Sequence, residues 1–182
     1  MFALAFMTTP APAQAPAAPP VVQELMQNSE GFGEEVTLPG MPMVFIDGKV
    51  TWDKAWPTIT DRFKTISGFI AKQKLAPGGA PIAIYLSVYD MGFKYQAAVP
   101  LAAAPAKLPF GAVIAGQSPV GKAIKFVHHG SYESMEMLYE AINNYLDGKG
   151  IAKQGLFYEE YVTDPLTTPE DKLVVNVYVM VK

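Results

Sequence analysis

Hydrophobic positions recur at regular spacings along this chain, and they predict two amphipathic helices. In residues 57–74 and again in residues 131–150, apolar side chains fall three or four positions apart, which is the spacing of one face of an α-helix. A proline precedes the first segment's pattern, and glycines follow the second. The side chains predicted to face inward are Ile59, Phe63, Ile66 and Ile70 in the first helix and Met135, Leu138, Ile142 and Leu146 in the second.

The segments around these helices are rich in β-branched and aromatic residues and predict strands. Two follow each helix, and a further strand-like run precedes each, so the order β-α-β-β occurs twice, in repeats of about 34–107 and 108–182. One such unit alone would leave its sheet face half covered. We therefore predict an α+β domain of two tandem repeats related by a pseudo-twofold axis, with an antiparallel sheet and two helices on one face. The predicted strands lie within residues 41–52, 82–90, 93–101, 110–116, 121–129, 155–165 and 172–182.

Composition narrows the classes of function. Of the 182 residues, 50% are hydrophobic and 17% are charged, which suits one domain with a sizeable core. The net charge is −3 without a basic run, so we expect no nucleic-acid partner, because phosphate binding needs clustered Lys and Arg. The absence of cysteine excludes disulfides, thiolate metal ligands and Cys nucleophiles.

The two histidines do not predict a metal site. His128 and His129 are neighbours on a predicted strand, so their side chains point to opposite faces and cannot chelate one ion together. We expect no metal and no cofactor, and we expect His129 to support the start of the second helix.

Residues 1–33 differ in composition from the rest. A short apolar run over residues 2–7 is followed by Ala13-Gln14-Ala15, a small-x-small pattern typical of signal cleavage sites. We interpret this region as the remnant of an export signal followed by a disordered Ala/Pro-rich linker. The protein is then expected to be periplasmic or secreted; the alternative is a disordered arm on a cytoplasmic protein.

The stretch YEEYVTDP, residues 158–165, contains two neighbouring acids framed by tyrosines. Alternation along a strand puts Phe157, Glu159 and Tyr161 on one face and Glu160 on the other. The second repeat's strand aligns with the first's at an offset of 74 residues, which matches Glu159 with Tyr85. We therefore predict that Glu159 and Tyr85 face each other across the pseudo-twofold axis, at the floor of a cleft.

Four segments together resemble the GyrI-like family: HHGSYESM, YEEYVTDPLTTPEDKL, the final VNVYVMVK, and FKYQAAVPL at the end of the first repeat. This family is the effector-binding domain of AraC- and MerR-type regulators and also occurs alone. The resemblance covers residues 34–182 and implies the tandem fold with a small-molecule cleft between its halves. The family's acid stands two residues before the strand tyrosine, which corresponds to Glu159; the proline usual near the end of the last strand is Met180 here. We expect a stand-alone, exported, monomeric member.

Three roles for the acid follow. A charged Glu159 among aromatic rings would attract small hydrophobic or cationic molecules by ion pairing and cation–π contact, as the resemblance to multidrug-sensing members also implies. Alternatively, Glu159 and Tyr85 could act as base and acid in the hydrolysis of a strained or electrophilic compound, since some stand-alone GyrI-like proteins use a Tyr/Glu pair in this way. In the third, both acids are solvated on an exposed strand. The residues predicted to bind the ligand are Glu159, Tyr161, Phe157, Tyr85, Trp56 and Tyr132.

Overall fold

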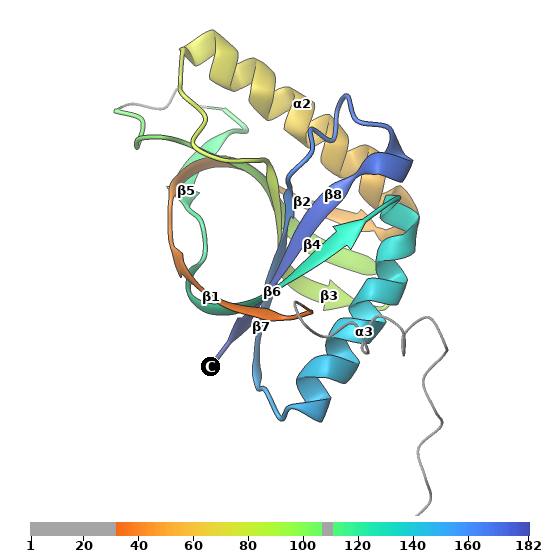
Figure 1. Cartoon of the computed structure of the whole chain (residues 1–182). Coiled ribbons are helices and arrows are strands. Elements are labelled where there is room, and N and C mark those ends of the chain that lie inside the picture. The colour runs from red at the N-terminus through yellow and green to blue at the C-terminus, as the bar shows by residue number, and fades with distance from the viewer. Residues whose placement is uncertain (1–31, 107–110) are drawn as a thin grey trace, which may run out of the picture.

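The computed structural model of the chain describes residues 32–106 and 111–182 (Figure 1). Residues 1–31, which make up most of the region 1–33 predicted to be an export remnant and linker, lie outside them. Within the described part, none of the helices has the length and apolar character needed to span a bilayer. The strands are β1 (Glu34–Pro39), β2 (Pro42–Thr51), β3 (Ile82–Tyr89), β4 (Gly92–Pro100), β5 (Ile114–Gln117), β6 (Val120–His129), β7 (Lys153–Tyr161) and β8 (Val174–Val181), and the helices are α2 (Ala55–Gln73) and α3 (Met135–Gly148), with the 3₁₀ turns η1 (Trp52–Lys54), η2 (Tyr132–Ser134) and η3 (Glu170–Lys172).

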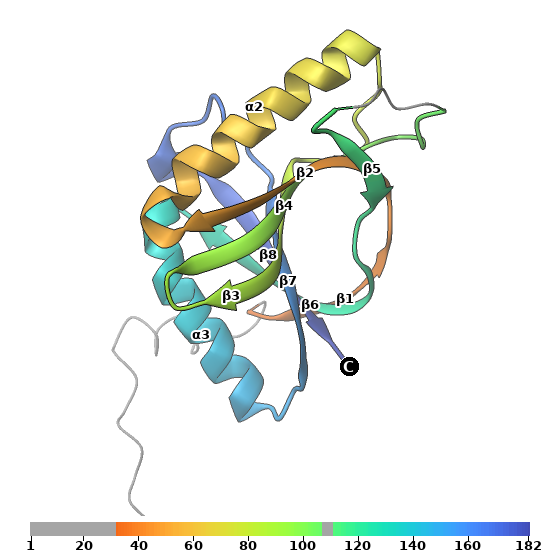
Figure 2. The ribbon, with the colours of Figure 1, turned by 180° about the vertical axis from the view of Figure 1, so that it is seen from behind.

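All eight strands form one antiparallel sheet in the order β1-β6-β8-β7-β3-β4-β2-β5. The equivalent strands of the two repeats are β1 and β5, β2 and β6, β3 and β7, and β4 and β8. If each strand is replaced by its equivalent, the order read from one end becomes the order read from the other. The sheet curls into a half-barrel, and Figures 1 and 2 show the two helices on one side of it and the edge strands β1 and β5 on the other. The predicted α+β fold with two helices on one face is confirmed.

The two helices are built as their apolar stripes predicted. All eight predicted inward-facing side chains are buried, together with one alanine on each helix. Helix α2 begins at Ala55, two residues earlier than expected, and Pro57 lies in its first turn. A proline is tolerated there because the first backbone N–H groups of a helix have no partner within the helix.

The pseudo-twofold axis passes through the pairing of β3 with β7. Ile84 lies opposite Tyr158, and these two residues are separated by the predicted repeat offset of 74. On either side of this pair, Ala83 lies opposite Glu159 and Tyr85 lies opposite Phe157. The two repeats therefore meet at the centre of the sheet, with equivalent residues on opposite sides of the axis.

The edge strands are exchanged between the repeats. β1 precedes β2 in the chain but pairs with β6 of the second repeat, while β5 pairs with β2 of the first. The loops that follow the two edge strands are joined by reciprocal hydrogen bonds: the Met41 N–H donates to Ser118 Oγ, and the Ser118 N–H donates to the Met41 carbonyl, both at 2.9 Å. Each repeat thus completes the sheet of the other.

Packing against the core starts just ahead of the predicted domain boundary at residue 34. The ring of Phe32 contacts Phe126 and Tyr145, with centroids 5.0 and 5.6 Å away. The Tyr145 hydroxyl also donates to the Gly33 carbonyl at 3.2 Å. Two residues that the sequence assigned to the linker therefore contact the folded domain.

Candidate functional site

A cleft of about 930 Å³ opens along the first turn of α2, the part of α3 from Met135 to Asn143, and the first half of the strand β7. It is formed by both repeats, as expected for a cleft between the halves. Apolar and aromatic side chains make up most of its wall. The lining residues are Trp52, Asp53, Trp56, Pro57, Val88, Tyr132, Glu133, Met135, Glu136, Tyr139, Ile142, Asn143, Lys153, Gly155, Leu156, Phe157, Glu170 and Val179.

An aromatic stack crosses this cleft between the starts of the two helices. The ring of Trp56 on α2 lies 5.0 Å from that of Tyr132 on η2, with an interplanar angle of 27°. The indole Nε1–H of Trp56 donates to Glu170 Oε1 at 3.0 Å, which fixes the indole from the η3 side. The stack thus joins the first repeat to the second at the wall of the cleft.

Glu159 lies behind this wall and is 0% exposed. Its two carboxylate oxygens each accept a hydrogen bond from a tyrosine, Oε1 from Tyr139 at 2.5 Å and Oε2 from Tyr161 at 2.6 Å. In residues 32–106 and 111–182 the one ion pair joins Lys125 to Glu34, so no cation of the described chain neutralises Glu159. The interpretation in which both acids are solvated is wrong.

Burial dominates the electrostatics of this cluster. It raises the pKa of the Glu159 carboxyl above its ordinary value, and the surrounding tyrosine hydroxyls that hydrogen-bond to it oppose part of this rise. The pKa values of Tyr85, Tyr139 and Tyr161 are also raised, first by burial and then by the negative charge of Glu159. The tyrosines therefore stay protonated at neutral pH and act as hydrogen-bond donors to the carboxylate.

This raised pKa predicts how stability changes with pH. A carboxyl whose pKa is higher in the folded than in the unfolded state contributes stability that is complete below the unfolded value, about 4.3. That contribution is lost as the pH rises through the folded value. We expect the wild-type melting temperature to fall relative to that of Glu159→Gln as the pH is raised from about 4.5 to 8, measured by circular dichroism. Parallel melting curves for the two proteins across this range would contradict the shift.

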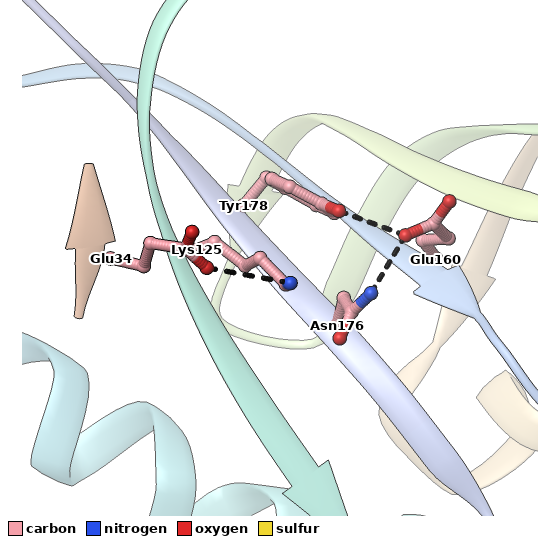
Figure 3. Close-up of polar contacts among 5 residues, drawn as sticks. All are labelled: Glu34, Lys125, Glu160, Asn176 and Tyr178. Carbon is pink, nitrogen blue, oxygen red and sulfur yellow. Dashed lines mark hydrogen bonds and ion pairs between the residues drawn. The ribbon is translucent and has the colours of Figure 1, made fainter. Parts of the chain in front are cut away.

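The neighbouring acid, Glu160, faces the other side of the sheet, as strand alternation predicted. Its Oε2 accepts hydrogen bonds from Asn176 at 2.8 Å and from Tyr178 at 2.9 Å (Figure 3). The ring of Tyr178 also stacks on Tyr158, with centroids 4.6 Å apart. The two adjacent carboxylates therefore belong to separate polar clusters on opposite faces.

The six predicted ligand-binding residues fall into two groups. Trp56, Tyr132 and Phe157 line the cleft. Glu159, Tyr85 and Tyr161 are buried and lie one contact behind the lining residues. Tyr85, for example, stacks on Phe157 with centroids 4.4 Å apart, and its hydroxyl is 3.1 Å from that of Tyr132.

The predicted opposition of Tyr85 and Glu159 needs correction in its detail. Across the strands, Glu159 lies opposite Ala83, and Tyr85 lies opposite Phe157. The reason is geometric: residues related by a twofold axis lie opposite one another only on the axis itself, which the pair Ile84 and Tyr158 occupies. Tyr85 and Glu159 are therefore diagonal neighbours on the cleft side.

Sequence reasoning missed Tyr139, which both lines the cleft and donates to Glu159. Its position four residues after Met135 places it on the buried face of α3 and could have revealed it. The four acids of the cleft wall were also missed: Asp53, Glu133, Glu136 and Glu170. Trp52, another residue that was missed, is 47% exposed, lines the cleft and lies against the ring of Phe93, with the ring centroids 4.8 Å apart.

His128, and not His129, supports the start of η2. His128 is 7% exposed, and its Nε2 lies 2.9 Å from the Ser131 carbonyl. The expected role of His129 was therefore wrong, because alternation on β6 turns that side chain to solvent. Across the described ranges, no three His, Cys, Asp or Glu side chains are grouped closely enough to hold a metal ion.

A family model matches this chain over residues 34–182, and its description is "GyrI-like small molecule binding domain". This is the same span that the motifs indicated. No curated protein sequence matches the chain.

Solved structures share the fold at low sequence identity. The chain is similar to EcmrR, solved in a complex with DNA, at 12% identity and a TM-score of 0.70, over 89% of this chain and 62% of that one. SAV2435, solved with bound tetraphenylphosphonium, matches at 19% identity and a TM-score of 0.54, over 82% of this chain and 93% of that one. A hydrolase of Listeria innocua matches at 12% identity and a TM-score of 0.58, over 88% of this chain and 97% of that one.

Proposed function

Because the chain belongs to the family of GyrI-like small molecule binding domains, we propose that it binds small hydrophobic cations in the cleft in front of Glu159. The observation that carries this proposal is a fully buried carboxylate with no described cationic partner, one contact behind an aromatic wall. A charge in such surroundings interacts more strongly with a ligand charge than it would in water. Aromatic faces add cation–π attraction.

The charges on the wall of the cleft support the same ligand class. Four carboxylates and one lysine line it, which gives a net charge of −3. This equals the formal net charge of the whole chain, so the rest of the molecule is neutral in sum. A cleft lined by one sign of charge focuses the field and raises the local concentration of oppositely charged ligands. The lining residues that carry the charge are Asp53, Glu133, Glu136, Glu170 and Lys153.

A fold neighbour offers a first probe. SAV2435 was solved with tetraphenylphosphonium, a hydrophobic cation, and a ligand of that chemistry suits the aromatic wall and buried acid described above. The binding of tetraphenylphosphonium to the present chain would test the proposal directly.

We expect tetraphenylphosphonium to bind with a Kd in the micromolar range, about −8 kcal/mol, in isothermal titration calorimetry. Triphenylphosphine oxide, which is similar in shape but uncharged, should bind at least about tenfold more weakly, because it gains no ion pairing. Equal affinities for the two compounds would contradict the proposed preference for cations. Raising the salt concentration should weaken the binding of tetraphenylphosphonium but not that of triphenylphosphine oxide, because salt screens the charges of the wall.

Hydrolysis of a strained or electrophilic small molecule is a second candidate function. The observation that favours it is the contact of Tyr139 with Glu159, which links a carboxyl of raised pKa to the surface of the cleft. A carboxylate of raised pKa is a better general base, and a tyrosine can donate a proton. Tyr85, the general acid expected from sequence, does not line the cleft itself; its hydroxyl contacts that of Tyr132, which does. Mass spectrometry after incubation with cyclopropane-bearing compounds and esters distinguishes turnover from binding.

A further inference from the structure

Four tyrosine hydroxyls surround the single carboxylate of Glu159, and the number of their protons limits what a ligand can find there. Each hydroxyl has one proton to donate and two lone pairs that accept. An ionised carboxylate can only accept. The residues of this tyrosine cluster are Tyr85, Tyr132, Tyr139 and Tyr161.

Most of these protons are already used. The protons of Tyr139 and Tyr161 are both donated to Glu159. The hydroxyls of Tyr85 and Tyr132 share one hydrogen bond at 3.1 Å, which uses one of their two protons. At most one of the four protons is therefore left for a ligand, while every tyrosine oxygen keeps accepting capacity.

The tyrosine cluster reaches the cleft through Tyr132 and Tyr139, both of which line it. The charge of Glu159 turns the O–H dipoles of its donors inward, so that the negative oxygen end of the Tyr139 dipole points away from the acid. The acids of the wall add further groups that only accept. The one basic lining residue, Lys153, donates to Asn143 Oδ1 at 2.9 Å. Beside the stack of Trp56 and Tyr132, the polar groups offered to a ligand are thus mainly acceptors; the remaining donors of the lining are on Trp52, Asn143 and Lys153.

We propose that the cleft selects cations that carry N–H donors, such as protonated amines or amidines, over quaternary cations of similar shape. This inference rests on the proposed function and narrows its ligand class. An aromatic cleft without acceptors would show the opposite order, because an ammonium group loses more hydration than a quaternary group and would have nothing to donate to. Acceptors placed at the wall reverse this order through charge-assisted hydrogen bonds.

The test compares 1-naphthylmethylammonium with its N,N,N-trimethyl derivative by isothermal titration calorimetry on the full chain at pH 7. The two compounds share the ring and the charge, and they differ in N–H groups. We expect the primary ammonium to bind at least about tenfold more tightly, since one charge-assisted hydrogen bond accounts for that ratio.

Two variants connect this ratio to the tyrosine oxygens. Tyr132→Phe keeps the ring that stacks on Trp56 and removes only the hydroxyl. It should lower the ratio of the two affinities, ammonium over trimethyl compound, several-fold. Tyr145→Phe is the matched control, because the Tyr145 hydroxyl is bonded to the Gly33 carbonyl and does not line the cleft. It should leave the ratio unaltered.

Equal or tighter binding of the trimethyl compound by the wild type would overturn the inference while leaving the proposed function standing. A preference that persists in full in both Tyr132→Phe and Tyr139→Phe would overturn the assignment of the acceptors to the tyrosine oxygens and leave the acids of the wall in that role. If neither compound binds, and tetraphenylphosphonium does not bind either, the inference is overturned together with the proposed function.

Discussion

The substitution Glu159→Gln should weaken the binding of tetraphenylphosphonium by about 100-fold, which corresponds to about 2.7 kcal/mol. Glutamine keeps the size of the side chain and can still hydrogen-bond to Tyr139 and Tyr161, so the shape of the cleft is preserved. What is lost is a buried negative charge, which the surrounding protein screens weakly. Triphenylphosphine oxide should change by less than about threefold, because it has no net charge to pair.

Glu160→Gln provides the control for this measurement. It removes a carboxylate from the adjacent residue, but that carboxylate lies on the opposite face of the sheet with Asn176 and Tyr178. The phosphonium affinity of this variant should stay within about twofold of wild type. A loss of equal size for the cation and the neutral compound in Glu159→Gln would show that the acid shapes the cleft without supplying the attraction.

The largest expected effect on stability is that of Phe63→Ala, which should lower the free energy of unfolding by about 3–5 kcal/mol. Phe63 lies on α2, is 0% exposed and contacts the ring of Tyr161 edge-on, with centroids 5.2 Å apart. Truncation of Phe63 leaves a cavity between the helix and the sheet. This cavity lies next to Tyr161, whose hydroxyl donates to Glu159. Such a loss is a large share of the 5–15 kcal/mol by which domains are usually stable.

Urea unfolding measures this loss, with Phe69→Ala as the matched control. Phe69 is the same residue type on the same helix but is only partly buried, so its truncation should cost about 1–2 kcal/mol. Similar costs for the two variants would mean that α2 does not pack through the stripe containing Ile59, Phe63, Ile66 and Ile70. A change in the slope of the unfolding curve would indicate loss of two-state behaviour.

The helices and the central strands could be predicted because their burial is local in origin. The spacing of Ile59, Phe63 and Ile66 depends only on which side of α2 meets the sheet. Likewise, alternation along β7 was enough to separate Glu159 from Glu160. In such segments, the pattern along the chain and the pattern in space carry the same information.

The edge strands could not be placed in this way. β1 and β5 are short and largely exposed, so neither carries an apolar alternation that identifies a partner. β1 joins β6, which lies more than 80 positions further along the chain, and nothing local to β1 points to it. Pairing at an edge is decided by the whole curled sheet.

The candidate site shows the same limit. Glu159 could be found from the strand on which it stands, whereas the contact between Tyr139 and Glu159 joins a helix to a strand across two layers. The repeat offset placed Tyr85 on the correct face but not at the correct step of the ladder. A contact between layers depends on how far the helix lies along the sheet, which side-chain spacing does not determine.

The exchange of edge strands has a consequence for synthesis on the ribosome. When the first repeat has been translated, β1 has no partner and β2 has one open edge, because β6 and β5 have not yet emerged. An unpaired strand edge is a template for pairing with other chains, and contacts that wait for distant segments form slowly. To avoid self-association before the sheet is complete, the nascent first repeat would therefore depend on the binding of a chaperone, or on rapid translation of the second repeat.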